Sequence, residues 1–302
     1  MEINESILKR LARPQGPVDL VLDTDAYNEI DDQFAIAYMM KSPETLRPQA
    51  IYAAPFFNSN STGPADGMER SYQEILKLLS LMGREDMKVF RGSDRYLPDE
   101  NTPVESDAAR DLADRAMNYS QEHPLYVVAI GAITNIASAL LLRPEIKDRI
   151  VVVWLGGHSR EWPDSKEFNM FQDVAAARII FGCGLPLVQL PCMGVVSHFT
   201  VSGVELEAFL RGKNALCDYL VDHTEEEVRS YCQSPVWSRI IWDVTAVGWL
   251  MGKELMADVT IPSLIPQYDH HYSYCESRHP MKYVYYINRD GLLQDLVEKL
   301  TR

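Results

Sequence analysis

Four aspartates near the amino terminus could together bind a metal ion. Asp23 and Asp25 end the apolar run VDLVLDTD, and Asp31 and Asp32 stand side by side six residues further on. Grouped carboxylates repel one another and hold raised pKa values unless a cation neutralises them. Oxygen ligands with no cysteine or histidine nearby indicate Ca²⁺ or Mg²⁺ rather than zinc, and several carboxylates with backbone carbonyls favour Ca²⁺.

Helix capping is the simpler explanation of these acids. Asp31 could cap a helix that begins here, and the negative charge of Asp32 could interact favourably with the positive end of the dipole of that helix. Asp23 and Asp25 gain nothing from the dipole. We therefore favour a metal site for the four together.

The elements that must position these acids alternate along the chain. Short apolar runs are separated by amphipathic stretches, which predicts parallel strands joined by helices. We predict an α/β fold with an open, mostly parallel twisted sheet, helices on both faces and a small antiparallel addition at the C-terminal end, in a single domain over residues 1–302. In such sheets the ligand site lies beyond the carboxyl ends of the strands, where the four aspartates would gather.

The boundaries of the elements follow from the same patterns. The predicted strands of the parallel part are 18–25, 50–54, 87–90, 125–130, 150–155 and 185–190, with antiparallel strands between 259 and 288. The predicted helices are 31–41, 68–82, 108–119, 134–142, 174–181, 204–210, 225–231 and 243–251.

Composition and charge exclude several classes of partner. The formal net charge of -14 would repel a nucleic acid backbone. Five scattered cysteines predict neither a disulfide framework nor a zinc site. The charged amino terminus and the lack of a long apolar run predict no secretory signal and no membrane span, so we expect a cytoplasmic protein.

Four segments carry a resemblance to a known family. LDTDAYNEIDDQFAIAY resembles the amino-terminal motif of the nucleoside hydrolases, the inosine-uridine-type ribohydrolases, in which Asp-x-Asp, a short turn and Asp-Asp precede a helix. VVAIGAITNIASAL, EFNMFQDVAAA and WDVTAV resemble three later family elements, in the same order. The resemblance implies Ca²⁺-dependent hydrolysis of the N-glycosidic bond of a ribonucleoside to ribose and free base, and a homo-oligomer, either dimer or tetramer.

The resemblance also implies roles for individual residues. Asp25 would act as metal ligand and as general base on the attacking water. The further metal ligands would be Asp32, Asp243 and the backbone carbonyl of Ile130. The residues that would bind the sugar are Asp31, Asn58, Glu167 and Asn169.

Three departures from the family pattern concern the substrate. The turn between Asp25 and Asp31 has five residues where the common family motif has three. Glu161 stands where the family has an asparagine, which changes a contact to the sugar 5′-hydroxyl. Trp242 stands where pyrimidine-tolerant members have a histidine, and it resembles the tryptophan of purine-preferring members. We therefore expect a purine preference and a catalytic role for Trp242, which would stack on the base and favour its protonation.

Two other functions fit parts of the pattern. A non-catalytic nucleoside- or sugar-binding homologue would keep the metal site and lose turnover, although Asp25 is retained. A phosphohydrolase with an aspartate nucleophile would use Asp23-Thr-Asp25, but Tyr27 stands where that class needs threonine or valine.

Overall fold

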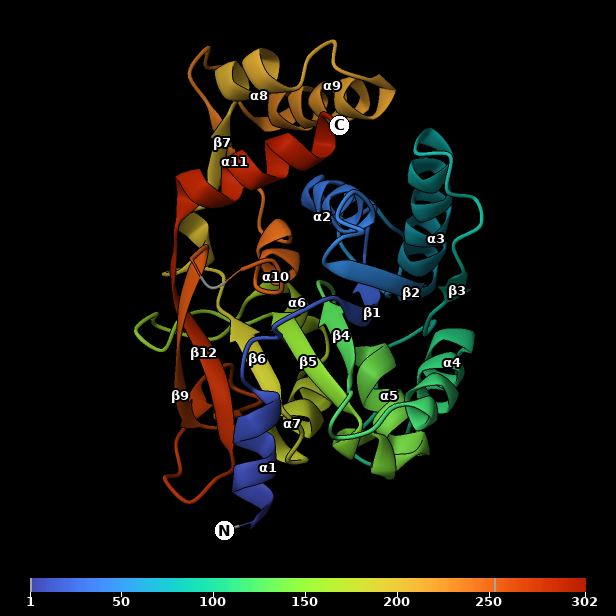
Figure 1. Cartoon of the computed structure of the whole chain (residues 1–302), viewed down its shortest axis with the longest axis vertical. Helices are drawn as coiled ribbons and strands as arrows, with labels where there is room; N and C mark the ends of the chain where they lie inside the picture. The colour runs from blue at the N-terminus through green and yellow to red at the C-terminus, as the bar shows by residue number, and fades with distance from the viewer. Residues whose placement is uncertain (1, 253) are drawn as a thin grey trace.

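An eight-stranded sheet runs through the computed structural model, which describes residues 2–252 and 254–302. Its strand order is β3-β2-β1-β4-β5-β6-β12-β9 (Figure 1). Neighbouring strands are parallel except for β9, which is antiparallel to β12. The predicted open, mostly parallel sheet is therefore confirmed. The strands are β1 (Val18–Thr24), β2 (Leu46–Ala53), β3 (Val89–Arg91), β4 (Leu125–Ala129), β5 (Ile150–Leu155), β6 (Leu187–Leu190), β9 (Met256–Pro262) and β12 (Pro280–Ile287).

Helices cover both faces of this sheet. The central strands β4 and β5 are buried at every position, as the continuous apolar runs LYVVA and IVVVWL require. One face is covered by α2 (Asp31–Met40), α3 (Pro64–Leu81), α9 (Ala215–Tyr231), α10 (Val244–Gly248) and α11 (Arg289–Leu300). The other face is covered by α4 (Asp107–Arg115), α5 (Thr134–Leu142) and α7 (Val174–Gly182).

Helix α2 lies in the interior and carries two of the aspartates with it. All ten of its residues are buried, and α10, α3 and α11 pack against it. A helix that is apolar on every side is stable only in such a core. Its first residues, Asp31 and Asp32, are consequently held away from bulk water at the edge where β1 ends.

The C-terminal strands belong partly to the main sheet. β12 lies beside β6 in parallel register, with Lys282 opposite Val188, and β9 pairs with β12 on its outer side. Two further antiparallel pairs are small: β7 (Thr200–Ser202) with β8 (Ser238–Ile240), and β10 (Ile265–Pro266) with β11 (Tyr272–Ser273). The predicted antiparallel addition is therefore present and is joined to the parallel sheet through β12.

Some boundaries differ from the sequence expectations. The helix predicted for 225–231 is the second half of α9, which begins ten residues earlier because Asn214 caps it by accepting from the Cys217 amide at 2.9 Å. Helix α1 (Glu2–Arg10) was not predicted, and it packs against β12. Two further helices are short, α6 (Phe168–Gln172) and α8 (Gly203–Phe209). Within the described ranges, none of the helices is both long and apolar enough to span a bilayer.

Candidate active site

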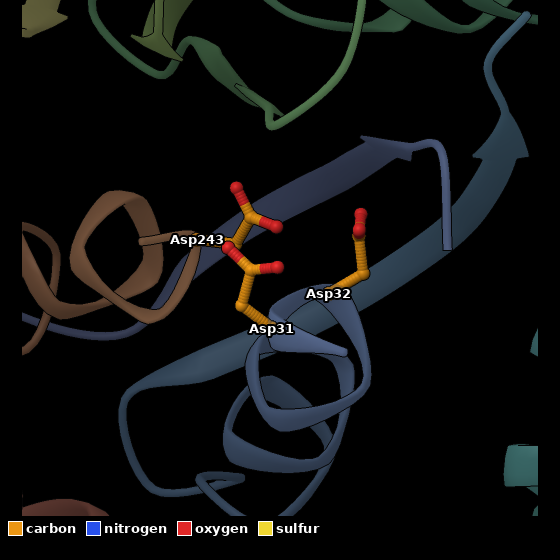
Figure 2. Close-up of side chains that lie close together, drawn as sticks. All are labelled: Asp31, Asp32 and Asp243. Carbon is orange, nitrogen blue, oxygen red and sulfur yellow. The ribbon is translucent and has the colours of Figure 1, made fainter. Parts of the chain in front are cut away.

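Three buried carboxylates meet at the carboxyl edge of the sheet. Asp31 and Asp32 open α2, and Asp243 immediately precedes α10 (Figure 2). Carboxylate oxygens of the three residues all lie within 4.8 Å of one another. Helix capping does not explain them, because the N-cap position of α2 is Ile30 and it makes no side-chain capping bond. The structure thus unites the amino-terminal motif with the late Trp-Asp element.

The two other predicted acids of the motif lie beside this group. Asp23, at the end of β1, accepts a hydrogen bond from the Asn135 side chain at 2.8 Å. The same Asn135 amide donates to the Ala53 carbonyl of β2 at 3.2 Å, so it ties β1, β2 and α5 together. Asp25 is 1% exposed and follows β1 directly. It is not a member of the three-carboxylate group, but its charge adds to theirs.

Burial and mutual repulsion define the electrostatics of these acids. Burial, and then the neighbouring charges of Asp32 and Asp31, raise the pKa of Asp25 well above its ordinary value. Burial is also the main cause of the raised pKa values of Asp32 and Asp243, followed by the charge of Asp31. The pKa of Asp31 is raised to about 7 by burial, although nearby Arg239 opposes the shift. Full ionisation of these four aspartates is therefore unfavourable unless a positive charge lies close to them.

The donor set fits a hard divalent cation. Both oxygens of Asp25 and one oxygen of Asp32 are buried and have no hydrogen-bond partner among the described residues. The other oxygen of Asp32 accepts from the Thr24 hydroxyl. Buried carboxylate oxygens without partners are costly unless a cation binds them. Oxygen ligands of this kind suit Ca²⁺ or Mg²⁺.

A cavity of about 220 Å³ opens beside the carboxylates. Its lining combines the carboxyl groups of Asp31 and Asp243 with the aromatic side chain of Trp242. Ile130, whose carbonyl was expected to bind the metal, lines the cavity, and that carbonyl accepts from the Asn169 side chain at 3.2 Å. The residues that line the cavity are Asn28, Glu29, Asp31, Ile130, Leu155, His158, Glu167, Phe168, Asn169, Cys192, Met193, Trp242 and Asp243.

Two predicted sugar contacts come from the start of α6. Glu167 caps this helix, and its carboxylate accepts from the backbone amides of Asn169, Met170 and Gly157 at 2.8 to 3.0 Å. Burial nevertheless raises the pKa of Glu167 to about 7. The Asn169 amide donates to the carbonyls of Ile130 and Leu155, so its position is fixed by the ends of β4 and β5. Both residues line the cavity in rigid positions.

Asn58 lies behind the cavity wall and is not among its lining residues. Its side-chain amide donates to Oδ1 of Asn28 at 2.5 Å, and the Asn60 amide donates to the Asn28 carbonyl at 2.8 Å. Asn28 itself lines the cavity. The five-residue turn therefore places Asn28 between Asn58 and the site.

Several residues of the site were not singled out from the sequence, among them Arg239, Glu29 and His158. Arg239 is 8% exposed and forms ion pairs with Glu29, with Glu227 at 3.3 Å and with Asp31 at 3.8 Å. Glu29, in the longer turn, and His158, after β5, line the cavity. The only sequence signal for Arg239 is a lone cation three residues before the Trp-Asp pair, and a single charged residue at that spacing identifies nothing.

Trp242 forms part of the cavity wall, as the resemblance implied. It is half-buried, and it packs against the core that covers this face of the sheet. Its carbonyl accepts from the Thr245 hydroxyl at 2.7 Å, which fixes the start of α10. The same turn therefore orients both Trp242 and Asp243.

Comparisons with known proteins agree with this architecture. The family model described as inosine-uridine preferring nucleoside hydrolase matches residues 20–275. The pyrimidine-specific ribonucleoside hydrolase RihA of Citrobacter koseri is 25% identical over 260 residues, which cover 76% of this chain and 78% of that protein. The residues matched by the family model include all four motif segments.

Two solved structures share the fold. The purine-preferring ribonucleoside hydrolase from Gardnerella vaginalis is 20% identical and has a TM-score of 0.77, covering 94% of this chain and 98% of that one. The plant nucleoside hydrolase PpNRh1 is 22% identical and has a TM-score of 0.75, covering 94% of this chain and 99% of that one. From the family match, this chain belongs to the inosine-uridine preferring nucleoside hydrolases and is a hydrolase of the nucleoside N-glycosidic bond.

Proposed function

We propose that this enzyme hydrolyses purine ribonucleosides to ribose and free base with Ca²⁺ as its metal. The observation that carries the proposal is the set of buried, partly unpartnered carboxylates beside a cavity with a tryptophan in its wall. The ligands would be Asp25, Asp32, Asp243 and the carbonyl of Ile130. A bound Ca²⁺ would neutralise the carboxylates and polarise the attacking water.

Asp25 is our candidate for the general base. Displacement at the anomeric carbon passes through an oxocarbenium-like transition state, so a water must lose a proton as it attacks. Both carboxylate oxygens of Asp25 are free to accept that proton. Without a cation, burial and the neighbouring acids raise the pKa of Asp25.

The sugar would lie between Asp31, Glu167 and Asn169. Asp31 offers a carboxylate that can accept from ribose hydroxyls. Glu167 is held by three backbone amides, so its charge is fixed before the substrate arrives. A fixed negative charge beside the ring stabilises positive charge that develops on the sugar. Asn58 would act on the substrate only through Asn28, against which it lies.

The purine preference is based on the apolar end of the cavity. Trp242, Phe168 and Leu155 offer it apolar and aromatic surface. An indole face gains more contact area from a two-ring base than from a one-ring base. RihA is described as pyrimidine-specific and the Gardnerella vaginalis enzyme as purine-preferring, so the family contains both specificities.

A panel of ribonucleosides tests the proposal. Inosine, guanosine, adenosine, uridine and cytidine are each incubated with the enzyme, with Ca²⁺ or with a chelator, and free ribose is measured. We expect ribose release from the purine nucleosides with Ca²⁺, and loss of the activity with chelator that Ca²⁺ restores. Equal release from uridine would contradict the role of Trp242. Binding without release from any nucleoside would favour the non-catalytic homologue.

A cytoplasmic location, a role in purine salvage and homo-oligomeric assembly belong to the same proposal. The resemblance to the family supports a dimer or tetramer. Light scattering on the purified protein measures its mass in solution, and a mass equal to one chain would contradict the oligomer.

A further inference from the structure

His158 lines the cavity from a loop that none of the family motifs includes. It follows β5, whose last residue, Leu155, also lines the cavity, and it is half-buried. Its ring makes an edge contact with Trp162, with ring centroids 5.9 Å apart. Phe168, Met193 and Trp242 line the same cavity, and the Met193 backbone contacts the His158 ring. We therefore place His158 in the part of the cavity that we assign to the base.

One hydrogen bond fixes which ring nitrogen of His158 carries the proton. The backbone N–H of Met193 donates to Nδ1 at 3.3 Å, so Nδ1 acts as acceptor. Burial lowers the pKa of His158, although the charge of Asp164 opposes this, and the ring is neutral near neutral pH. A neutral imidazole that accepts at Nδ1 carries its hydrogen on Nε2. His158 thus keeps one N–H donor that its own hydrogen bond does not use.

Three carboxyl groups and one amide of the cavity are poorly suited to help a base depart. Asp31, Glu167 and Asp243 are carboxyl groups, which accept hydrogen bonds when they are ionised. The Asn169 amide already donates to the carbonyls of Ile130 and Leu155. A leaving base gains negative charge when its bond to the sugar breaks, and a positioned N–H donor stabilises that charge.

We propose that His158 is a catalytic residue that donates an Nε2–H hydrogen bond to the departing base. The inference rests on the nucleoside hydrolysis proposed above. The C1′–N bond breaks and its electron pair remains on the base, while the water oxygen bonds to C1′ and the water proton passes to Asp25. The base then takes a proton from solvent and Asp25 returns its proton, so one water is consumed. His158 keeps its own proton throughout and orients the base.

Two variants separate the two nitrogens of the ring. His158→Asn keeps an acceptor near the Nδ1 position for the Met193 amide but removes the distal donor. His158→Gln restores a distal N–H donor. His198→Asn is the matched control, because His198 is exposed and lies outside the lining of the cavity. Unchanged circular dichroism and melting temperature establish that each variant is folded.

The substrates distinguish help to the leaving group from other roles. Inosine needs its base stabilised, whereas p-nitrophenyl riboside releases a phenolate that is stable without a donor. We expect His158→Asn to lower kcat on inosine about 100-fold, the usual size for loss of one such donor. Its kcat on p-nitrophenyl riboside should change by less than about threefold, His158→Gln should recover part of the inosine activity, and His198→Asn should match the wild type.

Each outcome decides one question. An equal loss on both substrates, or no loss on inosine, would overturn the role of His158 while nucleoside hydrolysis stands. A wild-type enzyme that releases ribose from neither inosine nor p-nitrophenyl riboside would overturn the proposed function, and the inference with it.

Discussion

The two ends of the cavity are built on different principles. Around the proposed metal and sugar site, Asp25, Asp31, Asp32 and Asp243 are at most 4% exposed and are held by the end of β1 and the starts of α2 and α10. At the base end, Phe168, Met193, Trp242 and His158 are half-buried, and two of them, His158 and Met193, come from loops that follow β5 and β6.

The difference shows where this fold can vary. Carboxylates fixed by regular elements cannot move without disturbing the core, so the chemistry at the sugar end is preserved by packing. Loop residues at the base end can change with little cost to the core. On the proposed function, the buried acids would carry the hydrolysis and the loop residues would select the base.

Asp25→Asn should have the largest effect. The amide cannot accept the proton of the attacking water, and we expect kcat on inosine to fall by at least about 1,000-fold at saturating Ca²⁺. Asp19→Asn is the control, since Asp19 lies on the same strand and pairs with Arg47 outside the cavity. Steady-state kinetics and ligand titration measure both variants. Near-normal turnover in Asp25→Asn would remove Asp25 from the base role.

Arg239→Gln should destabilise the sugar end strongly. The substitution leaves Glu29, Glu227 and Asp31 without their shared cation, and loss of one partner from a buried ion pair costs about 3 kcal/mol. Denaturant unfolding measures the loss. Arg229→Gln, which breaks an exposed pair with Glu225 on α9, should leave the midpoint almost unchanged. If both variants behave alike, the contrast in burial between the two ion pairs has no energetic meaning.

The metal-free enzyme should lose stability as pH rises. Burial raises the pKa of Asp23, Asp31 and Glu167 to about 7, above the unfolded values of about 4. The folded state therefore binds more protons than the unfolded state, and the stability present at low pH is lost as pH rises toward 7. In chelator we expect Tm to fall on the order of 5 °C between about pH 5 and about pH 8.

Added Ca²⁺ should remove most of this decline, because a cation bound to the ionised carboxylates stabilises the folded state. Differential scanning fluorimetry across the pH range, with chelator and with Ca²⁺, measures both curves. A Tm that is constant or rising in chelator would show that burial does not raise the pKa values of these acids in the folded state.

The same contrast explains what the sequence could predict. The acids of β1 and α2 were predictable because a mostly apolar strand and a largely apolar helix fix where Asp25 and Asp32 must lie. The start of α9 was not predictable. Its first turns depend on the N-cap at Asn214, and the periodic pattern of apolar residues does not indicate that cap. The role expected for Asn58 came from the family motif, whereas the longer turn places Asn28 in front of it.

Long-range contacts were the hardest to predict. Arg239 reaches Glu29 across a separation of 210 residues, and no local pattern indicates such a partner. The position of His158 depends on an amide of the loop after β6. Such tertiary contacts leave no periodic signal, so only the folded chain shows them.

Helix α2 has a further consequence for how the protein is made. Its acids need Asp243, and the helix itself packs against α10 and α11, with the Tyr38 hydroxyl donating to Asp295. On the ribosome the first aspartates emerge long before these partners are synthesised. The nascent chain therefore cannot assemble the full set of proposed ligands before Asp243 is made, and metal capture would wait at least until α10 has been synthesised.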